Sequence, residues 1–355
     1  MNSELYGKTD IKSMTKPELT DYIIKMGYPK FRAAQIYDWI HKKTVTGFSE
    51  MTNVPAGMRD VLEEKTVLPA FTVLARLKSE KGDTEKFLFG LGDRNAIESV
   101  LMRYKHGNSV CISSQVGCRM GCKFCASTLG GLVRNLNASE MLEQVYAIQR
   151  ISGERVSNVV VMGSGEPMDN FDNFVRFFTL LTDPDGLNIS GRNITVSTCG
   201  LVPEIRKLAE LDLSLTLAVS LHASDDTERK KIMPVANKYN IAEILDACRE
   251  YFSKTGRRVS FEYSLIAGEN DSAESAKKLA LLLKGMGAHV NLIPVNPVKE
   301  RDFKRSNVTN ILNFQEILEK NGINATIRRE MGADIDAACG QLRRSYILGK
   351  EKREE

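Results

Sequence analysis

Three cysteines lie close together in the sequence and have the spacing of ligands to an inorganic cluster. They are Cys118, Cys122 and Cys125, in the segment Cys-Arg-Met-Gly-Cys-Lys-Phe-Cys. Iron–sulfur clusters are normally held by four cysteine thiolates, so three thiolates would leave one iron of a four-iron cluster open to a substrate or cofactor. Structural zinc is the alternative, but it requires four closed ligands. Because the next cysteine is Cys199 and no histidine follows at zinc-finger spacing, the pattern favours an iron–sulfur cluster over zinc.

A second group of residues is small or polar and lies at the ends of consecutive predicted strands. The glycine-rich turn Gly163-Ser-Gly-Glu-Pro167 would let a ligand approach the backbone, and its glutamate could accept a hydrogen bond from an amine. One such motif is usually only a turn, and one histidine at such a place is often structural. Together, however, polar residues at successive strand ends predict a cofactor site at the mouth of a barrel. The candidates are Gly165, Glu166, Ser197, Ser220, Leu221, His222 and Asn296.

The elements that would position these residues alternate between strand and helix from about Cys111 onwards. Strands are predicted at residues 156–162, 193–197, 215–220, 259–266, 289–294 and 324–328. Helices are predicted at residues 140–150, 171–181, 203–211, 241–255, 272–286 and 308–321. Alternation of this kind implies a parallel sheet. Since about six such units are too few for an eight-stranded barrel, we expect an α/β fold with a partial (βα)6 TIM-like barrel.

The sequence before the barrel divides into two regions. Residues 1–70 are predicted to be helical, with a capping box at Thr15 and Glu18, and to form an accessory domain that either packs on the core or contacts RNA. Residues 71–102 change to a strand pattern and are predicted to form a β-rich linker region with hairpin turns. We expect the core barrel and a C-terminal cysteine segment over residues 103–345, followed by a charged tail over 346–355.

The composition is that of an ordinary globular protein, with 42% hydrophobic and 26% charged residues in a chain of 355. No apolar run is long enough for a membrane span, and the N-terminal segment has no signal-peptide pattern. Seven cysteines without a secretion signal indicate the reducing cytoplasm. The net charge of +4 is mild, but basic residues gather late in the chain, where they form either a solvated face or a phosphate-binding surface. They are Lys299, Arg301, Lys304, Arg305, Arg328, Arg329, Arg343 and Arg344.

The cysteine motif, the GxGE turn and the alternating pattern together resemble the radical S-adenosylmethionine (SAM) superfamily. Two further segments narrow the resemblance. One is Cys111-Ile-Ser-Ser-Gln-Val-Gly117, and the other is Gly332-Ala-Asp-Ile-Asp-Ala-Ala-Cys339-Gly-Gln-Leu342. With these segments the chain resembles the RlmN and Cfr family of RNA methyltransferases, over about residues 15–347.

The resemblance implies a role for each candidate residue. Cys118, Cys122 and Cys125 would ligate a [4Fe-4S] cluster, and the strand-end candidates would hold SAM, of which two molecules are used per turnover. Cys339 would carry the methyl group, Cys111 would resolve the protein–RNA adduct through a disulfide with it, and Glu98 would accept a proton. Taken singly, Cys111 could be a buried strand cysteine and Cys339 a mobile thiol. Two other cysteines match no family role and are interpreted as structural, with the first expected near the cofactor; they are Cys199 and Cys248.

The resemblance also implies a substrate. We expect methylation of adenine C2 in the peptidyl-transferase loop of 23S rRNA and in the adenosine 3′ of the anticodon of some tRNAs, by a monomer that receives electrons from a donor such as flavodoxin or ferredoxin. The close alternative is Cfr-type methylation of C8, which confers antibiotic resistance. Pro167, after Glu166, favours the RlmN type, whereas Ser164 departs from the methionine common in the family and is expected to change packing under the cofactor. A radical enzyme for a small molecule or protein, and a non-catalytic RNA-binding protein with a redox cluster, remain alternatives from other classes.

Overall fold

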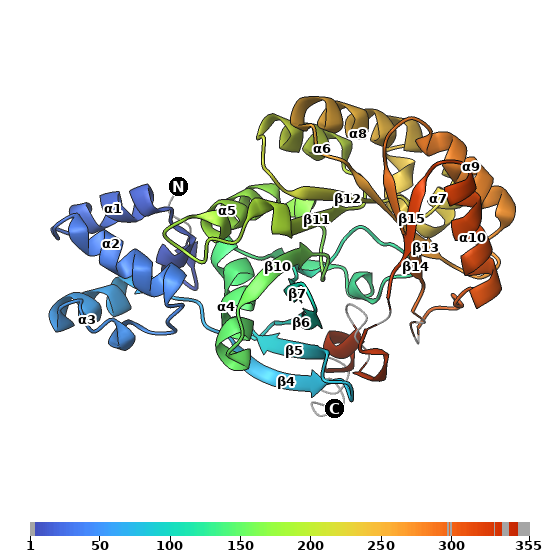
Figure 1. Cartoon of the computed structure of the whole chain (residues 1–355). Coiled ribbons are helices and arrows are strands. Elements are labelled where there is room, and N and C mark those ends of the chain that lie inside the picture. The colour runs from blue at the N-terminus through green and yellow to red at the C-terminus, as the bar shows by residue number, and fades with distance from the viewer. Residues whose placement is uncertain (1–3, 297, 299, 330, 336–340, 347–355) are drawn as a thin grey trace.

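The structure, a computed structural model, describes residues 4–296, 298, 300–329, 331–335 and 341–346. A small helical part formed by the N-terminal residues lies at one side of a much larger part, in which helices surround a curved sheet (Figure 1). No helix in these described ranges combines the length and apolar character needed to cross a membrane.

The large part is built on one ten-stranded sheet. Seven of its strands are parallel, and they lie side by side in the order in which they occur in the chain. The parallel strands are β7 (Gly107–Cys111), β10 (Val156–Val161), β11 (Ile194–Thr198), β12 (Thr216–Ser220), β13 (Ser260–Leu265), β14 (His289–Pro294) and β15 (Asn324–Ile327). Among the described residues the edge strands β15 and β4 do not pair with each other, so the barrel is open. The expectation of a partial (βα)6 barrel is therefore confirmed.

Three antiparallel strands extend the same sheet on the side of β7. They are β4 (Thr72–Lys78), β5 (Thr84–Gly90) and β6 (Ala96–Tyr104). These strands lie in the region over residues 71–102 for which the sequence predicts a strand pattern, and β6 continues to Tyr104 and pairs directly with β7. The region over residues 71–102 therefore forms part of the wall of the core sheet.

Amphipathic helices cover the outer face of the sheet (Figure 1). They are α4 (Ala138–Ser152), α5 (Phe171–Thr182), α6 (Val202–Glu210), α7 (Asp226–Ile232), α8 (Ile241–Thr255), α9 (Ala273–Leu283) and α10 (Val308–Lys320). Local sequence sets their ends: the Asn240 side chain accepts a hydrogen bond from Glu243 N at 2.9 Å where α8 begins, and Gly256 ends it with φ of +66°. Only α7 was not predicted, because its charged sequence has no apolar period.

The N-terminal part contains α1 (Lys16–Lys25), α2 (Phe31–Tyr37) with a following π-helical turn (Asp38–Lys42), and α3 (Ala56–Lys65). As the capping box predicts, the Glu18 carboxylate accepts a hydrogen bond from Thr15 N at 2.8 Å. A small sheet of β1 (Glu4–Leu5), β2 (Lys8–Asp10) and β3 (Thr66–Val67) was not predicted, because strands of two or three residues have no readable alternation.

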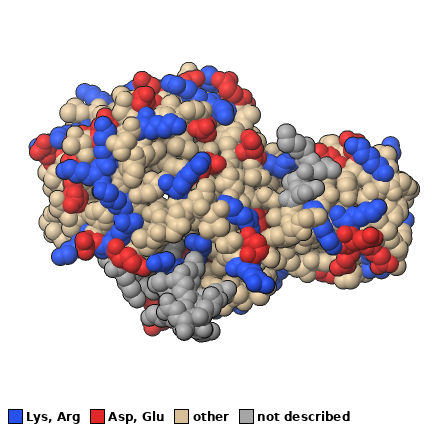
Figure 2. Space-filling view, turned by 180° about the vertical axis from the view of Figure 1, so that it is seen from behind, with Lys and Arg blue, Asp and Glu red and all other residues tan. Residues whose placement is uncertain are grey.

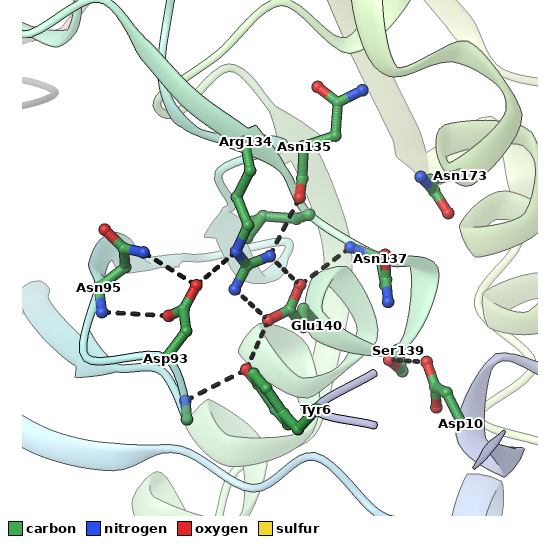
Figure 3. Close-up of polar contacts among 12 residues, drawn as sticks. Tyr6, Asp10, Asp93, Asn95, Arg134, Asn135, Asn137, Ser139, Glu140 and Asn173 are labelled. Atoms are coloured by element: carbon green, nitrogen blue, oxygen red, sulfur yellow. Dashed lines mark hydrogen bonds and ion pairs between the residues drawn. The ribbon is translucent and has the colours of Figure 1, made fainter. Parts of the chain in front are cut away.

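Polar side chains join the N-terminal part to α4. Figure 3 shows Tyr6 donating to Glu140 at 3.0 Å, and Arg134 bridging Glu140 and Asp93. Nearby, Lys12 and Glu143 form a fully buried ion pair of 2.7 Å. The N-terminal part is thus joined to the core through several buried or half-buried charges.

Candidate functional site

The cysteine loop leaves the sheet just after β7 and is closed at its base by a short antiparallel pair, β8 (Gln115–Gly117) and β9 (Leu132–Asn135). Cys118 N donates to Gly131 O at 2.9 Å across this base. Gly117 has φ of +78°, and a Cβ there would lie 2.0 Å from Gly131 O. Only glycine therefore fits at the entrance to the loop.

The loop opens onto a cavity of about 330 Å³ at the C-terminal ends of the strands. This volume is in the range of small-molecule and cofactor sites. The cavity brings together most of the residues that the sequence singled out. The candidates that line it are Cys111, Cys118, Cys122, Cys125, Gly165, Glu166, Ser197, Ser220, His222 and Asn296.

Three candidates lie elsewhere. Leu221 is fully buried in the core and is not among the cavity-lining residues, so a cofactor would meet at most its neighbours. Glu98 is on β6, which contributes Val100 and Met102 to the cavity wall, but Glu98 is not itself among the cavity-lining residues. Cys339 lies outside the described residues.

The three cysteine side chains fit a cluster better than a single metal ion. All three line the cavity, yet in the described part of the chain no group of three Cys, His, Asp or Glu side chains converges as ligands of one ion. Burial raises the pKa of Cys118 to about 12 and also raises that of Cys122. Such thiols become ligands when a positive metal centre deprotonates them. Three thiol side chains around one cavity are a donor set that fits an iron–sulfur cluster.

Glu166 is fixed by hydrogen bonds at the end of β10. Its carboxylate accepts from Cys199 N at 2.7 Å and from Met168 N at 3.1 Å. Gly165 precedes it with φ of +107°, and a Cβ there would lie 2.6 Å from the Gln115 side chain. Burial raises the pKa of Glu166, although these hydrogen bonds favour the ionised form. The arrangement holds an oriented acceptor in the cavity wall.

His222 is held as a neutral ring. Its Nδ1 accepts from Ser264 N at 2.9 Å, so the proton lies on Nε2. Burial, with a contribution from Arg229, lowers the pKa of His222 to about 3. Phe124 of the cysteine loop packs edge-on against the ring at 4.9 Å between centroids. His222 is therefore a fixed hydrogen-bond donor that also touches the cysteine loop.

Hydroxyl and amide groups from neighbouring strands complete this wall. The Oγ atoms of Ser197, on β11, and Ser220, on β12, are 3.4 Å apart. Asn296, just after β14, lines the same cavity. Side chains from four strand ends, those of β10, β11, β12 and β14, thus meet around one space.

Glu98 lies between the sheet and the described C-terminal residues. It forms a buried ion pair of 3.0 Å with Lys86 on β5. Arg343 donates to it through its main-chain N–H and donates through Nε to Ala96 O at 2.8 Å. The segment after Cys339 in the chain is therefore in contact with Glu98.

The late basic residues only partly gather at the site. Arg305, Arg328 and Arg329 line the cavity, whereas Arg344 pairs with Glu300 at 3.6 Å. On the face seen in Figure 2, Lys and Arg side chains alternate with Asp and Glu and form no single large basic patch. The basic residues that could meet a bound substrate are therefore the three arginines that line the cavity.

One residue beside the cavity escaped the sequence analysis. Arg229 is fully buried, although it lies in a charged segment with no apolar period. Cys199 lines the cavity, as its position next to Ser197 suggested, and contacts Glu166. Cys248 lines a separate, smaller pocket beneath α8.

Comparison with known proteins agrees with this site. Residues 112–280 match the family model of the radical SAM superfamily, and residues 9–68 match that of the ribosomal RNA large subunit methyltransferase N-terminal domain. A probable dual-specificity RNA methyltransferase RlmN of Lachnoclostridium phytofermentans is 62% identical, over 96% of this chain and 95% of that protein. Another, from Clostridium perfringens strain 13, is 55% identical over 96% and 98%. The crystal structure of a radical SAM methyltransferase from Sphaerobacter thermophilus superposes with a TM-score of 0.90 at 43% identity, over 94% of this chain and 98% of that one.

A partial barrel with a three-cysteine loop at its mouth and a match to the superfamily model define a radical SAM enzyme. The sequence identity to the RlmN proteins, which extends over almost the full length of the chain, shows the family within this superfamily. The chain belongs to the RlmN family of SAM-dependent RNA methyltransferases. Membership of this family argues against two alternatives from the sequence analysis, a radical enzyme for a small molecule or protein and a non-catalytic RNA-binding protein. It also does not favour the third alternative, Cfr-type methylation of C8. The family uses a [4Fe-4S] cluster and SAM.

Proposed function

We propose that this protein methylates adenine C2 in the peptidyl-transferase loop of 23S rRNA and in the adenosine 3′ of the anticodon of some tRNAs. The observation that carries the proposal is the shared cavity, because the cysteine loop, the oriented Glu166 and Cys111 all line one space. A target base would enter this space unstacked, as enzymes that act on a base require.

In this proposal the cavity wall binds cluster and cofactor. Cys118, Cys122 and Cys125 hold the cluster by their thiolates. Glu166 orients the amino group of SAM, and the Nε2–H of His222 donates a hydrogen bond without titrating in the physiological range. When bound, the cluster and SAM supply a radical able to remove a hydrogen atom from an unactivated carbon, which side-chain acid–base chemistry cannot do. Two SAM molecules are consumed per turnover, one as methyl donor and one as radical source.

The remaining steps belong to three residues of the chain. Cys339 receives the methyl group on its sulfur, and the carbon then bonds to adenine C2. Glu98 accepts the proton lost from C2. Cys111 attacks the sulfur of Cys339, so that a disulfide forms and the carbon–sulfur bond breaks. The released methyl carbon takes up a proton, and one electron passes to the electron carrier. The ion pair with Lys86 keeps the Glu98 carboxylate ionised, so that it can accept, and fixes its position.

Cationic side chains at the cavity support an RNA substrate. Arg305, Arg328 and Arg329 present guanidinium groups, whose planar donors suit phosphate oxygens. The enzyme would act as a monomer in the cytoplasm and receive electrons from flavodoxin or ferredoxin.

Nucleoside analysis of rRNA and tRNA after anaerobic reaction tests the proposal. We expect 2-methyladenosine in both, and 8-methyladenosine in its place would contradict the assignment of C2. The variant Cys339→Ala should abolish methyl transfer, with Cys248→Ala as the matched cysteine control. Retained transfer by Cys339→Ala would show that Cys339 is not the carrier.

A further inference from the structure

Arg229, on α7, is fully buried, and its four hydrogen-bond acceptors among the described residues are all main-chain carbonyl oxygens. Its Nε donates to Leu221 O at 3.0 Å, and its Nη2 donates to Cys199 O at 2.7 Å. Longer contacts of 3.3 Å reach Ser220 O and Tyr239 O. All the hydrogen bonds that these contacts give to the Arg229 guanidinium therefore go to the main chain.

Three of the four carbonyls that Arg229 holds lie at the strand ends beside the cofactor cavity. Ser220 ends β12 and Leu221 follows it and leads into His222, and Cys199 follows β11. The same peptide segment faces both ways: Cys199 N donates to the Glu166 carboxylate while Cys199 O accepts from Arg229. One buried side chain therefore links the ends of β11 and β12 directly, and the Cys199 peptide extends the link to Glu166 after β10.

Gly200 makes room for this arrangement. Its φ is +99°, and a Cβ there would lie 2.7 Å from the Ile244 side chain and 3.5 Å from Arg229 Nη2. A larger residue would be strained at this φ and would collide with Ile244 on α8, whereas its Cβ would only touch the guanidinium at ordinary contact distance. The local sequence after β11 is therefore matched to a buried arginine.

A buried cation without a bonded carboxylate is costly unless negative charge lies near it. Burial lowers the pKa of Arg229, and the Asp226 carboxylate and the ionised forms of Cys199 and Cys122 oppose that effect. A guanidinium remains charged at neutral pH even so. Cys122 packs in the same buried group of side chains as Cys199, whose carbonyl oxygen Arg229 holds at 2.7 Å. Because Cys122 is a proposed cluster ligand, its thiolate in the bound state would place negative charge near Arg229.

We propose that Arg229 is a positioning residue with a second, electrostatic role. It fixes the ends of β11 and β12 beside the proposed SAM site, and its charge stabilises the reduced, more negative state of the cluster. The inference rests on the proposed function, because it assumes a cluster on Cys118, Cys122 and Cys125. Removing the charge should make the cluster harder to reduce, since reduction potentials depend on nearby charge and hydrogen bonds.

The test uses the anaerobically reconstituted full-length protein with Arg229→Met, Arg229→Gln and Arg229→Lys. Methionine and glutamine remove the charge, glutamine keeps a donor, and lysine keeps the charge without the planar fork. The matched control is Arg257→Met, because Arg257 Nε donates to Leu215 O at the opposite end of β12, away from the cavity. Iron and sulfide content, the midpoint potential followed by electron paramagnetic resonance, and the SAM dissociation constant are measured for each.

We expect Arg229→Met and Arg229→Gln to shift the midpoint potential to more negative values and to weaken SAM binding about tenfold, as the loss of charge-assisted hydrogen bonds predicts. Arg229→Lys should keep the potential but lose SAM affinity, and Arg257→Met should change neither. If Arg229→Met does not fold, the midpoint potential and SAM affinity of Arg229→Gln test the inference. A wild-type potential in the uncharged variants, or the same shift in Arg229→Lys, would overturn the inference.

These outcomes are separate from failure of the proposed function. If the wild-type protein bound no cluster, the proposed function itself would fail. If the wild-type protein carried a cluster and methylated RNA, but the midpoint potential did not change in the Arg229 variants, only this inference would fail.

Discussion

Lys86 and Glu98 form a buried ion pair of 3.0 Å between β5 and β6, and both side chains are almost fully removed from solvent. The two residues are twelve positions apart in the sequence and come together only because the strands are antiparallel. Removing one member of such a pair leaves an uncompensated buried charge, which costs about 3–5 kcal/mol.

The variant Lys86→Met should therefore lower the free energy of unfolding by about 3–5 kcal/mol, because the Glu98 carboxylate loses its buried cation. Denaturant unfolding of the full chain measures this. The double variant Lys86→Met, Glu98→Gln should recover much of the loss, since neither partner is then charged. Equal destabilisation of the single and double variants would show that packing, and not charge, dominates.

Gly165→Ala should weaken SAM binding by at least about tenfold, because the new Cβ requires a strained φ and collides with the Gln115 segment. The displaced residue is Glu166, whose orientation depends on this turn. Equilibrium binding of SAM measures the effect. Gly130→Ala is the control, since a Cβ there meets nothing within 4 Å. Normal SAM affinity in Gly165→Ala would mean that Glu166 does not depend on the turn.

Stability should fall as pH decreases from 7 to 5 because of two buried neutral histidines. Burial lowers the pKa of His41 and of His222 to about 3, whereas an unfolded histidine titrates near 6.5. The unfolded chain therefore binds more protons below pH 6.5, and each histidine contributes a loss of about 2 kcal/mol by pH 5. Above pH 7 this contribution is flat.

Chemical unfolding at pH 7 and pH 5 checks the pH effect. His41→Phe should reduce the difference between the two pH values by one histidine's share, because a phenylalanine cannot take up a proton. His106→Ala is the control at an exposed position. An unchanged pH dependence in His41→Phe would show that other groups cause it.

Arg329→Ala should weaken RNA binding at low salt and lower the magnitude of the salt slope by about one, because each phosphate contact releases a counterion. Arg329 lines the cavity and is exposed. Binding titrations at several salt concentrations measure the slope. Arg249→Ala, which removes an exposed arginine paired with Asp246, should leave the slope unchanged. Equal slopes for wild type and Arg329→Ala would exclude a phosphate contact at this position.

Much of the barrel could be predicted from the sequence because its parallel strands are buried and rich in β-branched residues. The run at 156–162 became β10 with nearly the same bounds, and the polar residues after the strands met in one cavity. The position of Glu98 beside Lys86 could not be predicted, since it depends on strand pairing. The burial of Arg229 was missed for a related reason: a charged segment without an apolar period gives no sign that one of its residues points inward.

The buried charges between the N-terminal part and α4 have a consequence for substrate choice. The pair of Lys12 and Glu143, with the contacts of Tyr6 and Glu140, joins the two parts without a free linker between them. An RNA that contacts both the N-terminal part and the cavity must then place its target base at a fixed distance and angle from the site where it contacts the N-terminal part. We expect the enzyme to select RNA by three-dimensional shape, so that two RNAs of unrelated sequence qualify when their folds share that dimension.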